Sequence, residues 1–469
     1  MYINKYNHYQ GDFPGVKTWK IALVVKIKID LEFKFNFQNK SSKTKKLQHE
    51  INPIISFDKS YRITMIPTFT RQLRKASTLA RNVPCEAASN MNWNYPTSIR
   101  FGAGRINELA AACAELNIQR PLLITDPGIM SVGTMVADAA SSLSNCPIYS
   151  DIQGNPTEAN VLGGVAAFKE HNCDGVVAFG GGSAMDAAKC VALMAGQSRP
   201  LFDFEDKADY SERVNVDGMV PCVAVPTTSG TGSEVGRASV ITDETDHTKK
   251  IIFHANMLPE RVILDPELTL KLPQHITAWV GIDALSHSME AFSSPFYHPM
   301  AHGMALEGMR LVKDYLPRLM KDGQDIEARS QLMVASTLGA TAFQKGLGAM
   351  HSLTHPAGGL LNTQHGQTIS VVMPYVLQFN RPAIEDSFVP LARYLNLENQ
   401  SVTGVTDWVL ELRETCGIPN TLAEIGVKEE HVATLAPMAV VDPSSGCNPV
   451  TVTEEAATKL YMNAINGTL

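Results

Sequence analysis

The strongest constraint on the fold is an alternation of strand and helix signals between about residue 91 and about residue 270. Three apolar runs end in turn residues: PLLITD (121–126), DGVVAFGGG (174–182) and PCVAVPTTSG (221–230). Helix-like stretches lie among these runs, including 106–116 and 184–195. Buried strands that alternate with helices form parallel sheets covered by helices on both faces. We therefore expect an α/β domain with a parallel sheet over residues 91–272.

The pattern changes at about Pro273, after which the β-branched runs disappear. Segments rich in Ala, Leu and Met with helical spacing replace them, at 276–292, 302–320, 326–344 and 454–465. We therefore expect an all-helical domain over residues 273–469. Two domains also suit a chain of 469 residues.

Composition excludes several classes of protein. With 44% apolar residues, 19% charged residues and no uncharged apolar run of about 18 residues, the chain is not expected to cross a membrane. The eight cysteines show no CxxC or paired spacing, which indicates reduced thiols and a cytoplasmic protein.

Charged residues are distributed unevenly along the chain. Residues 1–90 carry 16 Lys+Arg against 6 Asp+Glu, whereas residues 91–469 carry 24 against 41. The longer part is therefore acidic and is not expected to bind nucleic acid, which needs a basic face.

The first 90 residues form an atypical basic extension that we expect to be poorly ordered. Val25–Phe37 alternates apolar and polar residues as one half-buried strand would, without an evident partner strand. Ile66–Asn90 has the Arg-, Ser- and Thr-rich composition of transit peptides but lies far from the N-terminus. We expect native translation to begin at or near Met91, and a mature chain containing residues 1–60 would contradict this.

One carboxylate and several imidazoles form a candidate metal site. Asp283 and His287 are four residues apart and share a helix face, and His351 and His355 have the same spacing, with His365 ten residues beyond. A single histidine is usually an ordinary surface or core residue, but this grouping among Gly, Ala and Ser predicts a transition-metal ion such as Fe(II) or Zn(II).

A glycine-rich turn offers a site for phosphate groups. In DGVVAFGGGSAMDAAK (174–189) a buried-type strand runs into Gly180, Gly181 and Gly182, followed by Ser183 and a helix. Glycines allow the backbone to approach a diphosphate, and the helix N-terminus supplies free N–H groups. The segment lacks the GxGxxG pattern, so taken alone it is equally compatible with a plain turn.

A second loop is rich in hydroxyl groups. VPTTSGTGSEV (225–235) places Thr227, Thr228, Ser229, Thr231 and Ser233 around two glycines. Uncharged hydroxyls suit a neutral adenine, ribose or nicotinamide amide, and a structural turn stabilised by Ser and Thr is the alternative.

Two further polar residues follow predicted strands. Asp126 ends PLLITD, where a carboxylate accepts hydrogen bonds from ribose hydroxyls and repels a 2′-phosphate, which favours NAD over NADP. A helix cap is the more common role for such an acid. Asn155 lies in a turn after CPIYSDI and is more simply a turn residue.

Together these motifs resemble the iron-containing (group III) alcohol dehydrogenases, which share a superfamily with glycerol dehydrogenase and dehydroquinate synthase. The resemblance covers residues 91–469. It rests on six segments: GGGSAMDAAK (180–189), PTTSGTGSEV (226–235), LDPELT (264–269), GIDALSHSMEAFSS (281–294), HSLTHPAGGLLNTQHG (351–366) and MPYVLQFN (373–380).

The resemblance implies a Rossmann-like NAD-binding domain, a helical domain and a metal ion between them. It assigns the metal ligands as Asp283, His287, His351 and His365, and it places His355 near the nicotinamide. The implied cofactor contacts are Asp126, Asn155, Gly180, Gly181, Gly182, Ser183, Asp186, Thr227, Thr228, Thr231, Ser233, Val235 and Lys249. Lys250 is adjacent to Lys249, so the register at this last position stays open.

The activity implied is reversible hydride transfer between NAD(H) and a small primary alcohol or diol and its aldehyde. His355 would relay the alcohol proton, and the chain would form a homodimer or a larger homo-oligomer. The alternatives are a metal-free reductase of the maleylacetate type, a dehydroquinate-synthase-type lyase, and a non-catalytic metal- or nucleotide-binding regulator. Neither the choice of Fe(II) over Zn(II) nor the alcohol follows from the sequence.

Overall fold

The computed structural model describes residues 22–26, 30–34, 55–57, 63–65, 91–94 and 97–469. The chain divides into two compact units, Met1–Cys85 and Glu86–Leu469. Each unit is described by itself.

The first unit contains two antiparallel strand pairs: β1 (Ala22–Lys26) with β2 (Asp30–Lys34), and β3 (Ile55–Phe57) with β4 (Ile63–Met65). The prediction of one strand over Val25–Phe37 is wrong, because its described residues fall in two strands that pair with each other. The N–H and C=O groups of β2 are thus paired with those of the segment just before it. The expected poor order of residues 1–90 concerns mainly residues outside those described and stays a prediction.

A seven-stranded sheet organises the N-terminal half of the second unit. Its order is β5 (Met91–Asn94), β6 (Ser98–Phe101), β13 (Arg261–Leu264), β10 (Cys222–Pro226), β9 (Gly175–Gly180), β7 (Pro121–Ile124) and β8 (Ile148–Tyr149). The strands from β6 to β8 are parallel, and β5 pairs antiparallel with β6 at the edge. The predicted parallel sheet is confirmed.

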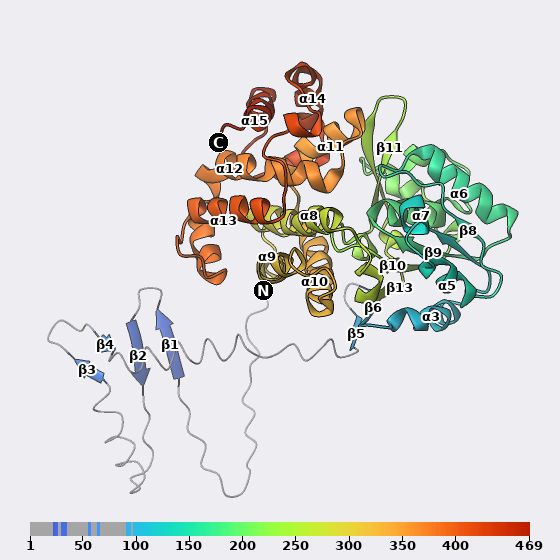
Figure 1. Cartoon of the computed structure of the whole chain (residues 1–469), viewed down its shortest axis with the longest axis horizontal. Coiled ribbons are helices and arrows are strands. Elements are labelled where there is room, and N and C mark those ends of the chain that lie inside the picture. The colour runs from blue at the N-terminus through green and yellow to red at the C-terminus, as the bar shows by residue number, and fades with distance from the viewer. Residues whose placement is uncertain (1–21, 27–29, 35–54, 58–62, 66–90, 95–96) are drawn as a thin grey trace, which may run out of the picture. The chain divides into compact units, whose positions relative to one another are not determined.

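Helices cover both faces of this sheet, as Figure 1 shows in green and cyan. Val177 and Phe179 of β9 pack on one face with α3 (Leu109–Glu115) and α5 (Met135–Ser141). The alternate residues of β9, which include Val176, pack on the other face with α6 (Glu158–Glu170) and α7 (Gly182–Met194). Because successive strand residues point to opposite faces, a continuous apolar run is what a doubly covered strand needs.

The C-terminal half is helical, and the change of pattern predicted near residue 273 falls between β13 and α8. Its helices are α8 (Gln274–Ser293), α9 (Pro299–Leu319), α10 (Ile326–Ala342), α11 (Ala349–Leu361), α12 (His365–Tyr394), α13 (Val402–Thr415), α14 (Glu429–Val441) and α15 (Glu454–Asn466). Among the described residues, none of the helices combines the length and apolar character that crossing a bilayer requires.

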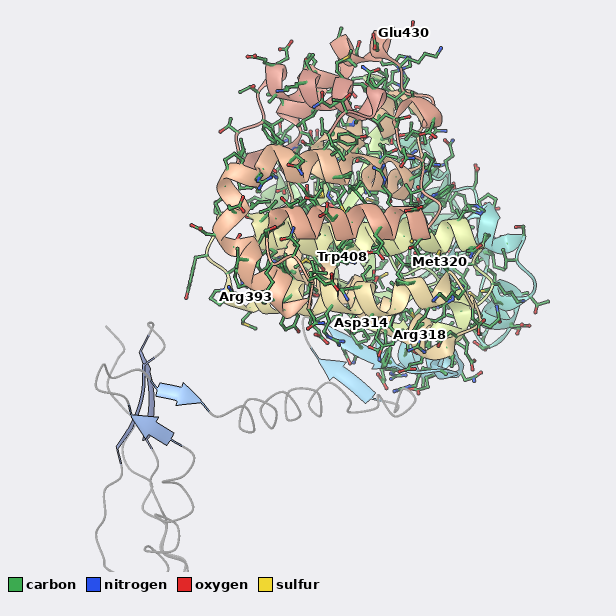
Figure 2. All side chains as sticks on the ribbon, turned by 60° about the vertical axis from the view of Figure 1, so that its left-hand side comes forward. Asp314, Arg318, Met320, Arg393, Trp408 and Glu430 are labelled. Carbon is green, nitrogen blue, oxygen red and sulfur yellow. The ribbon has the colours of Figure 1, made fainter. Side chains whose placement is uncertain are left out.

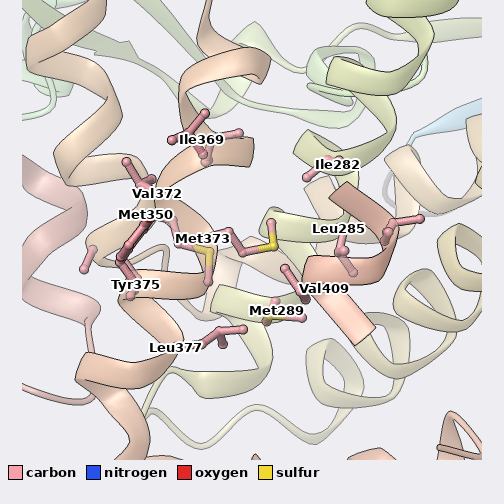
Figure 3. Packing of buried hydrophobic residues seen from close by; sticks show 14 of the residues in the cluster. Ile282, Leu285, Met289, Met350, Ile369, Val372, Met373, Tyr375, Leu377 and Val409 are labelled. Carbon is pink, nitrogen blue, oxygen red and sulfur yellow. The ribbon is translucent and has the colours of Figure 1, made fainter. Parts of the chain in front are cut away.

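One apolar core holds these helices together. Figure 3 shows Ile282, Leu285 and Met289 of α8 facing Met373 and Leu377 of α12, all of them buried. Burying such side chains contributes roughly 1.5–3 kcal/mol each. Charged side chains such as Asp314, Arg318, Arg393 and Glu430 occupy the outer surface of the helices, as Figure 2 shows. The core therefore packs α8 directly against α12.

A hairpin that the sequence did not predict connects the two halves. β11 (Ala238–Asp243) pairs antiparallel with β12 (Thr248–Phe253), and β12 packs against α11. Gly359 of α11 faces the backbone of His247 at the hairpin tip so closely that a Cβ would collide with its carbonyl oxygen. The hairpin therefore approaches α11 at a position where only glycine fits.

Candidate metal and cofactor site

Helix α8 brings a carboxylate and an imidazole to the N-terminal turn of α11. Asp283 and His287 lie on one face of α8, and their ligand atoms lie within 4.8 Å of each other and of His351 on α11. His365, the first residue of α12, places Nε2 3.5 Å from Asp283 Oδ1. The four residues assigned as ligands on resemblance are therefore brought together from three helices.

These side chains carry hydrogen-bonding atoms that nothing in the described protein satisfies. Asp283 Oδ1, His287 Nδ1, His351 Nε2 and His365 Nδ1 are all buried without a partner. Burying an unpaired polar atom costs free energy, and buried polar atoms are nearly always paired. One carboxylate and three imidazoles brought together from three helices form a donor set that fits a divalent transition-metal ion.

The electrostatics of the cluster favour metal-competent protonation states. Burial lowers the pKa of His287 to about 4 and that of His365 to about 3, although Asp283 opposes the shift in both. Burial alone would raise the pKa of Asp283, but His287, His365 and His351 hold it well below its usual range. At neutral pH His287 and His365 are therefore neutral imidazoles and Asp283 is an ionised carboxylate, which are the forms that bind metals.

Glu290 is a residue of the site that the sequence analysis missed. It lies on α8 three residues after His287, and its Oε2 is 2.6 Å from His351 Nδ1. Burial opposes protonation of His351, but the Glu290 carboxylate raises the pKa of this imidazole overall. The helical spacing of Asp283, His287 and Glu290, by four and then three residues, was the available signal.

His355, one turn after His351, faces a different partner. Its Nδ1 lies 2.9 Å from Oδ2 of Asp442, a buried residue at the end of α14. His355 therefore lies beside the rings of His351 and His365, with its own carboxylate partner. Asp442 carried no sequence signal, because it is 87 residues away along the chain.

The glycine turn is shaped as a backbone cradle. Gly180 has a φ of +156°, and α7 begins at Gly182 without a side-chain cap on its first N–H groups. The hydroxyl of Ser183 donates to the carbonyl oxygen of Gly154 at 2.5 Å. An uncapped helix start after glycines leaves N–H groups free for an anionic group.

The two cofactor loops lie against each other. A Cβ at Gly181 would lie 3.2 Å from Thr228 Cγ2, and a Cβ at Gly182 would lie 2.9 Å from Thr231 Cβ. The N–H of Thr227 donates to the carbonyl oxygen of Gly180 at 2.9 Å. The hydroxyl-bearing loop therefore forms one wall of the glycine cradle.

Three of the predicted cofactor residues are buried in the protein itself. The Ser233 hydroxyl donates to Asp186 Oδ1 at 2.5 Å, and the other oxygen of Asp186 accepts from the N–H of Val240 at 2.8 Å. Val235 packs in the apolar core beneath the sheet. These contacts hold the loop in place, and a direct contact of Asp186, Ser233 or Val235 with a cofactor stays a prediction.

The second loop also touches the helical half. A Cβ at Gly232, which has a φ of +64°, would lie 2.8 Å from the carbonyl oxygen of Ser336 on α10. Next to it, the buried Glu234 accepts a hydrogen bond from the Thr337 hydroxyl at 3.0 Å. The loop is therefore held against α10, which packs on α8.

Asp126 lies at the glycine cradle and is also a helix cap. Its Oδ1 accepts from the N–H of Ile129 at 3.0 Å, while its Oδ2 would lie 3.1 Å from a Cβ at Gly180. Burial raises the pKa of this carboxyl. Asn155 donates from Nδ2 to Asn362 Oδ1 at 2.7 Å, which joins its turn to the end of α11.

The two adjacent lysines of β12 have different surroundings. Lys250 pairs with Asp243 and with Asp246 of the hairpin itself. Lys249 points the other way, and a Cβ at Gly358 would lie 3.0 Å from its Nζ. Burial lowers the pKa of Lys249 to about 8, although Asp186, Asp442 and Asp283 oppose the shift. Lys249 is therefore the lysine that faces the candidate site.

Comparison with known proteins agrees with this geometry. The family model for iron-containing alcohol dehydrogenase matches residues 96–266, and the model for the C-terminal domain of the Fe-containing alcohol dehydrogenase family matches residues 277–465. The chain belongs to the iron-containing alcohol dehydrogenase family. As a member it is an oxidoreductase of the alcohol dehydrogenase class, and membership implies that it binds a metal ion and a nicotinamide dinucleotide.

Two curated relatives and one solved structure illustrate this membership. A 4-hydroxybutyrate dehydrogenase of Cupriavidus necator is 39% identical over 76% of this chain and 94% of its own length. The NAD-dependent methanol dehydrogenase of Bacillus methanolicus is 33% identical over 80% of this chain and its full length. A crystal structure of 1,3-propanediol oxidoreductase superposes with a TM-score of 0.74 at 29% identity, covering 81% of this chain and all of that one.

Proposed function

We propose that this iron-containing alcohol dehydrogenase transfers hydride reversibly between NAD(H) and a small primary alcohol or diol. The observation that carries the proposal is the convergence of one buried carboxylate, that of Asp283, with the imidazoles of His287, His351 and His365 from three helices. The names of the relatives support it, because they include an NAD-dependent methanol dehydrogenase and a 1,3-propanediol oxidoreductase.

The proposed metal ligands are Asp283, His287, His351 and His365, and the proposed ion is Fe(II), although Zn(II) suits the same ligands. When bound, the ion would supply a Lewis acid for the substrate oxygen, and the nicotinamide would supply the hydride acceptor or donor. The ligands would hold the ion at the junction of α8, α11 and α12, beside the second cofactor loop.

The proposed dinucleotide contacts lie in the two loops. The backbone of Gly180, Gly181 and Gly182 with the Ser183 hydroxyl would hold the diphosphate, because α7 begins there without a side-chain cap. The partly exposed Thr228 and Thr231 face the same cradle. The remaining proposed dinucleotide contacts are Asn155, Asp186, Thr227, Ser233, Val235 and Lys249. Asp126 Oδ2 supports NAD over NADP, since a carboxylate there would repel a 2′-phosphate.

The proposed proton carrier is His355. Because Asp442 engages Nδ1, the ring is left with Nε2 as the atom that takes the alcohol proton during oxidation and returns it during reduction. Its stacked arrangement with His365, with ring centroids 5.5 Å apart, supports a place beside the reacting centre.

We also propose the domain limits 91–272 and 273–469, a homodimer or larger homo-oligomer, and a cytoplasmic location. The change from strands to helices between β13 and α8 supports the domain limits. Family resemblance supports the oligomer. Seven free cysteines among the described residues support a reducing compartment.

The test is anaerobic NADH formation by the metal-stripped full chain, with Fe(II) or Zn(II) added back. Ethanol, 1-butanol, 1,2-propanediol, 1,3-propanediol and glycerol are the substrates to compare. Turnover that returns with metal on at least one of them would support the proposal. Equal turnover without metal would favour a metal-free reductase, and metal binding without turnover on any alcohol would favour the non-catalytic alternative.

A further inference from the structure

Glu290 joins helices α8 and α11 through both of its carboxylate oxygens. Oε1 accepts from the backbone N–H of Met350 at 2.6 Å and is 3.4 Å from the N–H of His351. Oε2 lies 2.6 Å from His351 Nδ1. The side chain is 3% exposed, so water does not compete for these contacts. One carboxylate therefore caps α11 and contacts the first imidazole on that helix.

The surroundings leave room for a carboxylate at this point. A Cβ at Gly348 would lie 3.1 Å from Glu290 Oε1 and 2.8 Å from Asn448 Oδ1. Asn448 Oδ1 accepts from the N–H of Ala349, the residue before Met350, at 3.0 Å. The first turn of α11 is thus capped by two side chains with separate roles, because only Glu290 also touches an imidazole.

The contact with Nδ1 decides which nitrogen of His351 carries the proton. An ionised carboxylate only accepts hydrogen bonds, so a neutral ring beside it keeps its proton on Nδ1. The other nitrogen, Nε2, is then a bare lone pair, and it is buried without a partner in the described protein. Carboxylate–histidine contacts of this kind orient metal-binding imidazoles.

We propose that Glu290 is a positioning residue of the metal centre, holding His351 in the Nδ1-protonated tautomer with Nε2 presented to the ion. The inference rests on the metal site proposed above. It goes beyond that site because it assigns a function to a residue outside the proposed metal ligands and cofactor contacts.

Replacement of the carboxylate by an amide isolates this role. In Glu290→Gln the single carbonyl oxygen accepts from Met350 N–H or from His351 Nδ1–H, but not from both. With the oxygen at Met350, the amide N–H faces Nδ1 and drives the ring proton to Nε2. With the amide reversed, two N–H donors face each other at Met350. Side-chain volume is nearly unchanged in either arrangement, so packing is not the variable.

The matched control is Asn448→Ala, which removes the other cap of α11 without touching an imidazole. Zn(II) affinity is measured by competition with a chromophoric chelator on the metal-stripped full chain, and Tm is recorded for each variant. We expect Glu290→Gln to bind Zn(II) about 10–100-fold more weakly than the unaltered chain. Asn448→Ala should lower Tm and keep nearly the original Zn(II) affinity.

Two affinity results would overturn the inference: Glu290→Gln binding Zn(II) as tightly as the unaltered chain, or Asn448→Ala losing as much affinity as Glu290→Gln. If the unaltered chain binds no Zn(II), the proposed metal site fails as well, so the two failures are distinguishable.

A second measurement reads the tautomer in the unaltered chain and uses a variant only to assign the signal. Nitrogen NMR of the metal-free chain labelled with ¹⁵N-histidine reports the tautomer of His351, assigned by the signal lost in His351→Gln. The spectrum is recorded at a pH high enough for this ring to be neutral, because Glu290 raises its pKa. We expect the proton on Nδ1, and a neutral ring with its proton on Nε2 would refute the inference.

Discussion

His355 Nδ1 and Asp442 Oδ2 lie 2.9 Å apart, although 87 residues separate them along the chain. Burial alone would raise the pKa of Asp442, but the adjacent His355 and the N–H of Ser444 keep it below its usual value. Asp442 therefore faces the imidazole as a carboxylate, fixes the ring and stabilises the protonated form that the proposed proton relay passes through.

Replacing Asp442 with Asn should lower kcat by about 10–100-fold, since the imidazolium of His355 loses its countercharge. Metal content should not change. The second function of Asp442, accepting from Ser444 N–H at 2.8 Å, is kept because Asn caps as well as Asp. Steady-state kinetics and metal analysis measure both quantities. The control is Asp325→Asn, the same change at the N-cap of α10, and equal kcat in the two variants would contradict the role of Asp442.

Replacing His287 with Ala should remove bound metal and turnover together, because one imidazole of the cluster is lost and three ligands hold an ion less well. Metal content by mass spectrometry and NADH formation are the measurements. His275→Ala is the matched control, as it removes an exposed imidazole from the same helix and should leave both quantities unchanged. Activity retained by His287→Ala without bound metal would refute the ligand assignment.

The fold class could be predicted because the spacing of apolar residues and the positions of turn residues are local properties of the sequence. The runs at β7, β9 and β10 are buried on both faces and end in turn residues, so their pattern is unambiguous. α12 was harder to predict, since it continues through Pro374, Pro382 and Pro390. Proline normally ends a helix, and here the surrounding helices and buried apolar side chains outweigh that cost.

The site was predictable where its residues lie close in sequence. Asp283 and His287 share one helix turn, whereas the assignment of His351 over His355 came only from family resemblance. The structure supplies a physical difference, because a ligand atom of His351 lies within 4.8 Å of those of Asp283 and His287, in a group that does not include His355. The two rings also have different carboxylate partners, Glu290 and Asp442. Long-range pairings of this kind leave no periodic trace in the sequence.

The lysine of the hairpin should be identifiable by substitution. Lys249→Met should weaken NADH binding about tenfold, because a partly desolvated charge near the diphosphate or ribose contributes on the order of 1.4 kcal/mol. Lys250→Met should bind NADH normally, as Lys250 is paired with Asp243 and Asp246. Fluorescence titration measures both. The reverse order of effects would exchange the two assignments.

The same lysine predicts a pH dependence. With its pKa lowered to about 8, Lys249 is charged at pH 7 and neutral at pH 9, so NADH affinity should fall across this interval and should not do so in Lys249→Met. Stability should respond in the opposite direction. Because the folded pKa lies below the ordinary 10.5, the unfolded chain binds more protons between about pH 8 and 10.5, and stability rises with pH there relative to Lys249→Met. Affinity that is constant from pH 7 to 9 would argue against this lysine.

The packing of the two cofactor loops predicts a further effect. In Gly182→Ala the new Cβ would lie 2.9 Å from Thr231 Cβ, closer than two carbons tolerate, so the loops must separate. Overpacking of this kind costs about 1–3 kcal/mol of unfolding free energy. The separation should also weaken NADH binding, since the cradle wall moves away from the start of α7.

Gly303→Ala is the control for this prediction. This exposed position on α9 has no atom within 4 Å of the new Cβ, and alanine there should raise helix stability by up to about 1 kcal/mol. Denaturant unfolding and NADH titration of both variants test the point, and a Gly182→Ala protein that binds NADH normally would mean that the glycine cradle does not hold the diphosphate.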